Sequence, residues 1–400
     1  MSFIVGLPSA GGKTTCNWSS PKWFSAANLY CDKPGMTTNG TLSESSQELV
    51  SFAKIYAHYH GYISIFVCLF GIVTNIFNIT VLTRKTMRTP VNHILSWLAV
   101  SDIITMVSYV PFALHFYCMY PSGSKTVRKN SQSWMNFMIF HINLTATTHT
   151  ISIWLCVTLA IVRFLHMRSP TKGNADRIRR IYQAKVMVFI VCIASTLILI
   201  PNYMSNQLLK DRDSETNETV FVLRDLKLGR NDTEPLVLVN VWVYAVVAKL
   251  VPCMLMAVFG SLLIYNIHVK IRHRRKILQI SGSNSVRLSE HSRTTKMLLA
   301  VIVLFLLTEL PQGVLVVCSA CIENFFDRVY IPLGDVMDIV ALVNNAVNFI
   351  LYCSMNSKFR QALVHLYCGA LLRRRTHENG YTLANSVLSK GHSNNKEGQS

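Results

Sequence analysis

Residues 61–83, GYISIFVCLFGIVTNIFNITVLT, contain no charged side chain. A helix that crosses a bilayer needs about 20 mostly apolar residues, so this stretch is long enough to span one. Six further apolar runs follow it along the 400-residue chain. The sequence therefore predicts seven membrane spans, at residues 61–83, 93–117, 134–162, 185–208, 236–268, 296–320 and 331–355.

The overall composition also indicates a membrane protein. Half of the residues are hydrophobic and only 15% are charged, whereas soluble domains carry about 25% charged residues. The net charge of +19 could indicate nucleic-acid binding. The basic residues instead cluster between the apolar runs, as they do in cytoplasmic membrane loops. We therefore expect no nucleic-acid partner.

The placement of Lys and Arg predicts the orientation of the chain in the plasma membrane. Cytoplasmic loops carry an excess of these residues, and four segments have it: 84–88, 163–185, 270–296 and 358–375. An odd number of spans then puts the N-terminus outside the cell and the C-terminus inside. The N-terminus has too short an apolar core for a signal peptide, so we expect the first span to direct insertion.

The glycosylation sequons agree with this orientation. Two of them lie inside predicted spans and are rejected: Asn78 and Asn143. Four fall in segments predicted outside: Asn17, Asn39, Asn217 and Asn231. Cysteines near the outside can form disulfides, although the sequence leaves their pairing open: Cys16, Cys31, Cys118, Cys318 and Cys321.

Few ionisable residues lie within the predicted spans, and such residues are functional candidates by default. Polar uncharged residues in spans more often bond only to neighbouring helices. Glu309 stands two residues before Pro311, and Lys249 three before Pro252. The ionisable candidates are Asp102, Lys249, Glu309, Asp335 and Asp338.

The order of landmarks along the spans resembles that of a rhodopsin-like (class A) G-protein-coupled receptor over about residues 55–370. The landmarks are Asn75, LAVSD (98–102), VRF (162–164), FLLTELP (305–311) and NFILY (348–352). More specifically, HTISIWLCVTLAIVRF (149–164), VVAKLVPC (246–253), LLTELPQG (306–313) and NFILYC (348–353) are similar to the invertebrate myosuppressin and FMRFamide-like neuropeptide receptors.

The resemblance implies a fold class and a domain organisation. We expect an all-α membrane protein, a seven-transmembrane helix bundle with a short amphipathic eighth helix. Residues 1–55 would form an extracellular glycosylated tail and residues 56–356 the receptor domain. Residues 357–370 would form the eighth helix, with Cys368 as a palmitoylation site, and residues 371–400 a disordered cytoplasmic tail.

The chain also departs from the general receptor pattern. Val162 stands where an acid usually precedes the arginine, and Phe349 replaces the usual proline of the last span. Glu309 occupies the place of the usual tryptophan of span six. Met138 stands where a cysteine is expected, so the disulfide common to most such receptors is predicted to be absent.

The resemblance further implies a ligand that ends in Arg-Phe-NH2 or a close variant. Its arginine needs an acid, either Asp338 or Glu309, and its phenyl ring needs aromatic walls. Alternatively, Glu309 pairs internally with Lys249, since a buried charge needs a partner; we weigh this slightly above ligand contact. The residues expected to face the ligand cavity are Thr145, His149, Tyr244, Glu309, Gln312 and Asp338.

Other residues match further functional positions of this receptor class. A sodium ion would bind oxygen atoms of Asp102, Ser152, Asn344 and Asn348; the alternative is a protonated Asp102 in an asparagine network. Arg163 and Tyr352 would act in the switch that engages a heterotrimeric G protein, with Gi/o-type coupling expected by analogy. No other cofactor is expected. The tail suits kinases and arrestin, and the basic segments suit anionic lipid.

Other classes of function fit less well. A channel or transporter would favour paired half-helices, inverted repeats or a charge-lined path. A retinal protein needs a lysine in the last span, and residues 333–355 contain none. No enzyme motif occurs in a suitable context, so we expect no enzyme. The alternative within the same fold is a receptor for another small peptide or a chemosensory ligand.

Overall fold

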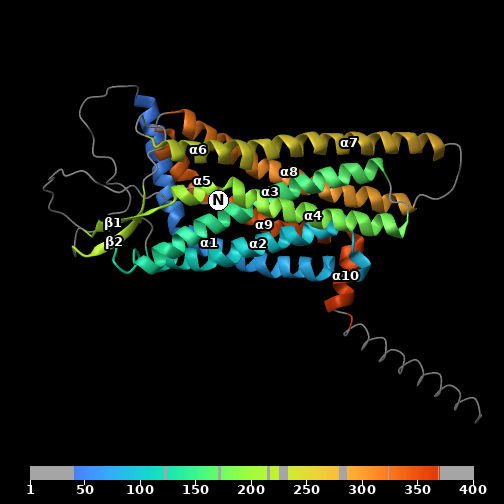
Figure 1. Cartoon of the computed structure of the whole chain (residues 1–400), viewed down its shortest axis with the longest axis horizontal. Coiled ribbons are helices and arrows are strands. Elements are labelled where there is room, and N and C mark those ends of the chain that lie inside the picture. Colours follow the sequence, from blue (N-terminus) through green and yellow to red (C-terminus); the bar gives the residue numbers. More distant parts are fainter. Residues whose placement is uncertain are drawn as a thin grey trace, which may run out of the picture.

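The computed structural model describes residues 40–120, 124–169, 173–213, 217–224, 233–278, 286–322, 324–367 and 369. Figure 1 shows an elongated bundle of helices with a β-hairpin at one end and the short helix α10 at the other. Within the described residues, seven segments are long and apolar enough to cross a membrane: Gln47–Leu82, Pro90–Met119, Gln132–Arg168, Asn174–Ser205, Pro235–Val269, Leu299–Cys321 and Phe326–Met355. The predicted seven-helix fold is therefore confirmed.

Three of the spans combine α-helix with a π-helical segment, which has a wider turn than an α-helix. These π segments are Leu114–Met119, Tyr244–Leu250 and Phe326–Tyr330. The α-helices are α1 (Gly40–Leu82), α2 (Pro90–Ala113), α3 (Gln132–Arg168), α4 (Asn174–Ile198), α5 (Ile200–Ser205), α6 (Pro235–Val243), α7 (Val251–Leu278), α8 (Val286–Cys321), α9 (Ile331–Met355) and α10 (Ser357–Tyr367). A 3-10 turn, Lys85–Met87, precedes α2. The start of α1 at Gly40 lies inside the segment predicted as an N-terminal tail.

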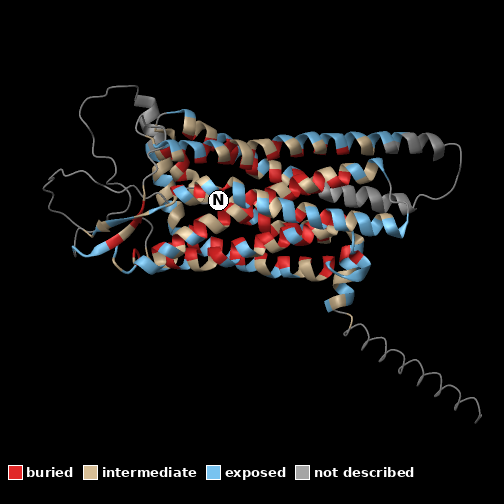
Figure 2. Cartoon of the chain, viewed as in Figure 1, coloured by how far each residue is buried: buried red, intermediate tan, exposed pale blue. Residues whose placement is uncertain are grey.

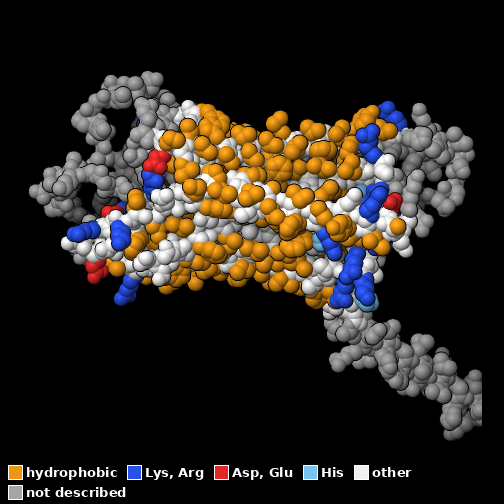
Figure 3. All heavy atoms as spheres, viewed as in Figure 1, with side chains coloured by type: hydrophobic (Ala, Val, Ile, Leu, Met, Phe, Trp, Pro, Cys, Tyr) orange, Lys and Arg blue, Asp and Glu red, His pale blue; other side chains and the backbone are white. Residues whose placement is uncertain are grey.

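The bundle places apolar side chains outside and polar side chains inside. Phe66, Phe189 and Leu307 are 73%, 66% and 69% exposed, whereas Asp102 and Lys249 are 0% exposed. Figure 2 shows the buried residues along the inner faces of the helices, and Figure 3 shows a broad apolar band around the middle with basic residues near both ends. This distribution suits lipid around the bundle, because exposed apolar surface is favourable only out of water.

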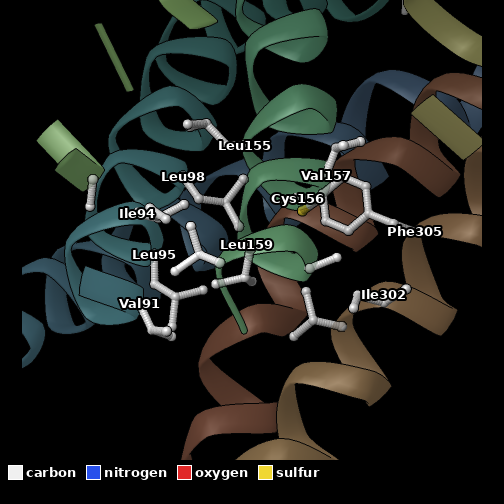
Figure 4. Close-up of a cluster of buried hydrophobic side chains, with 14 of the residues drawn as sticks. Val91, Ile94, Leu95, Leu98, Leu155, Cys156, Val157, Leu159, Ile302 and Phe305 are labelled. Atoms are coloured by element: carbon white, nitrogen blue, oxygen red, sulfur yellow. The ribbon is translucent and has the colours of Figure 1, made fainter. Parts of the chain in front are cut away.

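The α10 half of the bundle is held by close packing of apolar side chains. Ile94 and Leu98 from α2 meet Leu155 and Leu159 from α3, and Phe305 from α8 closes the cluster (Figure 4). All five are at most 1% exposed. Truncating such a buried side chain to alanine typically costs about 2–5 kcal/mol, so these contacts fix the relative positions of α2, α3 and α8.

Helices α1, α2 and α9 approach one another around a glycine. A Cβ atom at Gly71 would overlap Met106 Sδ and Cε, so a larger residue there would displace the end of the Met106 side chain. Four residues later, Asn75 Nδ2 donates to the backbone oxygens of Gly71 at 2.9 Å and of Asn345 at 3.0 Å. This amide ties α1 to α9.

Residues 208–223 contain an antiparallel hairpin that the sequence analysis did not predict. Strands β1 (Leu208–Arg212) and β2 (Thr219–Leu223) pair with Lys210 opposite Phe221. Asn130 holds the hairpin: its backbone oxygen accepts from Phe221 N and its Nδ2 donates to Phe221 O, both at 3.0 Å. We call the end of the bundle that carries β1 and β2 the hairpin end.

At the opposite end, α10 packs against α1 and α9. Tyr367 bonds Thr80 through their hydroxyl groups at 2.8 Å, and its ring lies 4.9 Å from that of Phe77. Phe77 also contacts Phe349, the residue that replaces the expected proline. Phe349 thus packs in a row of rings that joins α9 to α10 through Phe359.

Candidate functional site

The structure brings together Lys249 and Glu309 in the centre of the bundle. Lys249 lies in the π segment that precedes α7, and Glu309 lies on α8 beside Pro311. Lys249 Nζ is 2.5 Å from Glu309 Oε2, and the side chains are 0% and 1% exposed. A proline removes a backbone hydrogen bond from its helix, so the ion pair adjoins a weakened point of α8.

Two further side chains complete this network, and we call the four residues the central tetrad: His149, Lys249, Glu309 and Gln312. Lys249 Nζ donates to Gln312 Oε1 at 2.8 Å and lies 2.8 Å from His149 Nε2. An ammonium group has three protons, so the contacts with Glu309, Gln312 and His149 use all three when His149 Nε2 is the acceptor. The ring of Tyr244 lies 5.5 Å from the ammonium and covers it on another side.

The position of His149 admits two arrangements of one proton. Its Nε2 lies 2.9 Å from Glu309 Oε2 as well as 2.8 Å from Lys249 Nζ. A neutral imidazole nitrogen either carries a proton or accepts one. Nε2 can therefore donate to Glu309 or accept from Lys249, but it cannot do both. Among the described residues, Glu309 Oε1 and His149 Nδ1 have no hydrogen-bond partner.

Most of the residues predicted to face the ligand are buried in this conformation. Thr145 and Tyr244 are 0% exposed, and His149, Glu309 and Gln312 range from 0% to 4%. Thr145 bonds within its own helix, to the backbone oxygens of His141 and Ile142. The tetrad thus satisfies its charges internally, and a ligand reaches it only after these helices separate.

Asp338 lies outside the tetrad and faces α2. Tyr109 OH donates to Asp338 Oδ2 at 3.3 Å, and the aspartate is half-buried. One turn nearer the hairpin end, Tyr117 OH donates to Asp335 Oδ1 at 2.7 Å. Sequence reasoning noted Asp335 as ionisable but assigned it no role. Nothing in an apolar run distinguishes a hydrogen-bonding tyrosine from a core tyrosine, so Tyr109 and Tyr117 were missed.

Two of the three other residues predicted to bind sodium contact Asp102, which is 0% exposed. Ser152 Oγ donates to Asp102 Oδ1 at 3.1 Å, and Asn348 Nδ2 donates to Asp102 Oδ2 at 3.2 Å. Asn344 is 1% exposed, and neither of its side-chain polar atoms has a partner among the described residues. Asn348 Oδ1 also has no hydrogen-bond partner among the described residues. Unsatisfied buried oxygens beside a buried carboxylate fit a small hard cation.

The remaining predicted positions divide between described and undescribed parts of the chain. Arg163 and Tyr352 are 8% and 1% exposed near the α10 end. Asn217 lies in the hairpin turn with φ 54°, and Cys118, Cys318 and Cys321 form no disulfide with another described cysteine. The positions outside the described residues are Asn17, Asn39, Asn231, Cys16, Cys31 and Cys368.

The two rejected sequons have structural roles inside the bundle. Asn78 is 0% exposed, and its Nδ2 donates to Asn75 Oδ1 at 3.2 Å. Asn143 Oδ1 accepts from Asn206 Nδ2 at 2.7 Å and from Asn202 Nδ2 at 3.2 Å. Asn78 thus bonds within α1, whereas Asn143 joins α3 to α5 and to the residue that follows it.

Comparisons with known proteins agree with this architecture. Residues 62–369 match the model of the serpentine-type 7TM GPCR chemoreceptor family Srw. The G-protein coupled receptor dmsr-1 of Caenorhabditis elegans is 30% identical, with 81% of this chain and 71% of the relative aligned. The sex peptide receptor of Drosophila melanogaster is 23% identical, over 82% and 77% of the two chains. The Drosophila melanogaster FMRFamide receptor is 24% identical, over 76% and 53%.

The family match covers most of the seven-helix bundle, including the central tetrad and the residues around Asp102. Its relatives are receptors, and those named above include receptors for peptides. The chain is therefore a multi-pass membrane protein that belongs to the serpentine-type seven-transmembrane G-protein-coupled receptor family Srw.

Proposed function

We propose that this receptor binds an extracellular amidated peptide of the FMRFamide or myosuppressin type and activates a heterotrimeric G protein of the Gi/o type. It would act in the plasma membrane, with the hairpin end outside the cell and α10 inside. The sex peptide receptor and the FMRFamide receptor among its relatives support a peptide ligand. The basic segments 84–88 and 163–185 support this orientation, since Lys and Arg favour the cytoplasmic side.

The observation that carries the proposal is the different surroundings of two acids. Glu309 is buried and already pairs with Lys249, whereas Asp338 is half-buried and accepts a hydrogen bond from Tyr109 OH. A guanidinium group binds a carboxylate with charge-assisted hydrogen bonds. Asp338 is therefore the better partner for the peptide arginine, and Phe112 beside Tyr109 offers an aromatic wall for the phenyl ring.

The central tetrad would transmit binding to the cytoplasmic side. A ligand can shift a receptor only by binding one conformation better than another. A peptide entering from the hairpin end would separate the helices that bury the tetrad and change the partner of His149. Because Glu309 adjoins Pro311, the new arrangement would bias α8 toward a second position. Arg163 and Tyr352 would then meet the G protein.

The residues around Asp102 would hold a sodium ion in the inactive receptor. Asp102 would supply the negative charge, and Ser152, Asn344 and Asn348 would supply neutral oxygen ligands. When bound, the ion would neutralise a carboxylate that is otherwise costly to bury. Asn344 supports this role because its amide has no protein partner among the described residues.

Further partners follow from the same proposal. The basic segments on the cytoplasmic side would contact anionic lipid, and Cys368 would anchor the end of the eighth helix through palmitoylation. Kinases and arrestin would act on the tail beyond residue 370. Asn17, Asn39, Asn217 and Asn231 would carry glycans on the outer side.

A peptide-library screen on transfected cells with a G-protein activation readout tests the proposal. We expect responses to amidated Arg-Phe peptides and a strong loss of potency when citrulline replaces the peptide arginine. Pertussis toxin should abolish the response if coupling is of the Gi/o type. Silence to every amidated Arg-Phe peptide, with surface expression verified, would exclude this ligand class. A response only to other small molecules would favour a chemosensory receptor, as the family description suggests.

A further inference from the structure

A second carboxylate lies beside the proposed arginine site. Helix α9 leads directly into α10, so its N-terminal residues lie at the hairpin end, and Asp335 is closer to that end than Asp338. Residues three apart on a helix have Cβ atoms about 5–6 Å apart on one face. Both carboxylates accept from tyrosine hydroxyls of the second span, Asp335 from Tyr117 and Asp338 from Tyr109.

Asp335 has no basic partner among the described residues. Its polar contact within the described part of the chain is the hydroxyl of Tyr117. Glu309, in contrast, forms an ion pair with Lys249. A half-buried carboxylate is stabilised by a positive charge nearby, so the absence of one among the described residues favours a cation from the ligand.

A buried histidine points to the same chemistry. Tyr109 uses its proton to bond Asp338, so in its 2.9 Å contact with His60 Nε2 the tyrosine oxygen accepts and Nε2 carries the proton. In the neutral ring, His60 Nδ1 is then an acceptor. His60 is 0% exposed, and this nitrogen has no hydrogen-bond partner among the described residues. A buried acceptor without a protein partner can accept from a donor such as an ammonium or guanidinium N–H.

Aromatic rings surround these acceptors. The ring of His60 lies 4.7 Å from that of Tyr117, 5.5 Å from that of Tyr56 and 6.3 Å from that of Tyr109. Ring faces attract cations. The acceptors and rings come from α1, from α2 and its following π segment, and from α9, whereas the central tetrad is built from α3, α8 and the segment before α7. The two groups of residues therefore occupy different sides of the bundle.

We propose that Asp335, together with Tyr117 and His60, forms a second cation subsite that binds a positively charged group of the ligand other than its C-terminal arginine. This inference rests on the proposed function, in which Asp338 binds that arginine. The subsite is nearer the outer end, so it receives a group that precedes the arginine in the peptide, either a basic side chain or a terminal amine. The receptor then selects peptides with two positive charges.

The dipeptide amide Arg-Phe-NH2 tests the subsite, because it carries an α-amine and a guanidinium separated by one side chain. Its N-acetylated form retains only the guanidinium. Binding to the purified full-length receptor is measured by thermal shift over a range of concentrations. We expect the free amine to bind about tenfold more tightly than the acetylated form, as one charge-assisted hydrogen bond implies. Equal affinities on the unaltered receptor would overturn the inference without any variant.

Variants then locate the effect. Asp335→Asn should remove the difference between the two dipeptides, and Asp338→Asn should weaken both. Asp335→Glu, which keeps the charge, should preserve the difference if the asparagine variant does not fold. Asp176→Asn, at an exposed ion pair with Arg179 on α4, serves as the matched control and should change neither affinity. A difference that persists in Asp335→Asn would place the amine elsewhere and overturn the assignment.

The outcomes separate this inference from the proposed function. If neither dipeptide shifts the receptor while full-length amidated peptides activate it, the subsite is wrong and the proposed function stands. If the amine-dependent shift requires Asp335 but no amidated Arg-Phe peptide activates the receptor, the subsite stands and the peptide class is wrong.

Discussion

Lys249 and Glu309 form an ion pair at 2.5 Å in the centre of the bundle, and Lys249 belongs to a π-helical segment while Glu309 adjoins Pro311. Lys249 thus stands in a π-helical segment, and Glu309 stands beside a proline that cannot donate a backbone hydrogen bond. Such π segments are frequent at functional sites, and a charge pair between one of them and a proline-containing helix can hold the helices in one of two arrangements.

Removing one member of this pair should destabilise the receptor more than removing both. Glu309→Gln leaves the Lys249 ammonium without its counter-charge, and breaking a buried pair typically costs about 3–5 kcal/mol. Lys249→Met with Glu309→Met leaves no buried charge and should recover much of that loss. Melting temperatures of purified receptor and surface expression measure the effect. A double variant as unstable as the sum of the single variants would show that the pair is not coupled.

Sodium should lower agonist binding in the unaltered receptor but not in Asp102→Asn. The substitution removes the only negative charge among the four predicted sodium ligands, so the cation loses its electrostatic partner. Agonist binding is measured at rising sodium concentration with ionic strength held constant by N-methylglucamine. Ser101→Ala is a suitable control because the Ser101 hydroxyl bonds Thr148 O instead. An unchanged sodium response in Asp102→Asn would favour the asparagine network without a cation.

Asn130→Ala should loosen the hairpin. The substitution removes the Nδ2 bond to Phe221 O, which is worth about 0.5–1.5 kcal/mol, so exchange of the hairpin amides should accelerate about 2- to 10-fold. Hydrogen exchange of residues 217–224 measures this directly. Lys125→Ala, which breaks a partly exposed ion pair with Asp211, should have a smaller effect because surface pairs contribute little. Equal effects of the two variants would contradict the role assigned to Asn130.

Lys129 should make the receptor more stable as the pH rises above about 8. Burial lowers the pKa of this side chain from 10.5 to about 8. Below about pH 8 Lys129 is protonated in both the folded and the unfolded receptor, and the folded state bears the full cost of burying the charge. Between about pH 8 and 10.5 Lys129 loses its proton in the folded state but keeps it in the unfolded state, so the unfolded state binds more protons. The free energy of unfolding therefore rises by up to about 1.4 kcal/mol per pH unit there.

The melting temperature of the purified receptor between pH 7 and pH 10 measures this dependence. Lys129→Met should reduce the rise of the melting temperature with pH. Lys210→Met, at an exposed position of β1, should leave that rise unchanged. If Lys129→Met and the unaltered receptor have the same slope, Lys129 does not titrate in this range.

The seven spans could be predicted from the sequence because a helix that crosses the lipid bilayer needs a long run of apolar residues. The contact between Lys249 and Glu309 was one of two alternatives, since landmark spacing gives the face of a helix but not the rotamer that chooses a partner. His149 was assigned to the ligand rather than to this pair. Its role depends on a meeting of three helices, which no local pattern encodes.

The hairpin and the subsite at Asp335 were harder to predict, for different reasons. β2 reads TVFVL, a run of β-branched and aromatic residues that favours a strand, but its loop was interpreted only by its charge. Asp335 and Tyr117 are separated by 218 positions in the chain, so their hydrogen bond arises solely from packing of α9 against α2.

The π segment Tyr244–Leu250 also affects how this receptor is aligned with others. Because a π turn contains about one residue more than an α turn, residues on its N-terminal side are displaced by about one position relative to a receptor whose fifth span is α-helical throughout. If functional positions in Pro235–Val243 are assigned by counting residues back from Pro252, each assignment therefore falls on an adjacent residue. An alignment with such a receptor requires a one-residue gap across this segment.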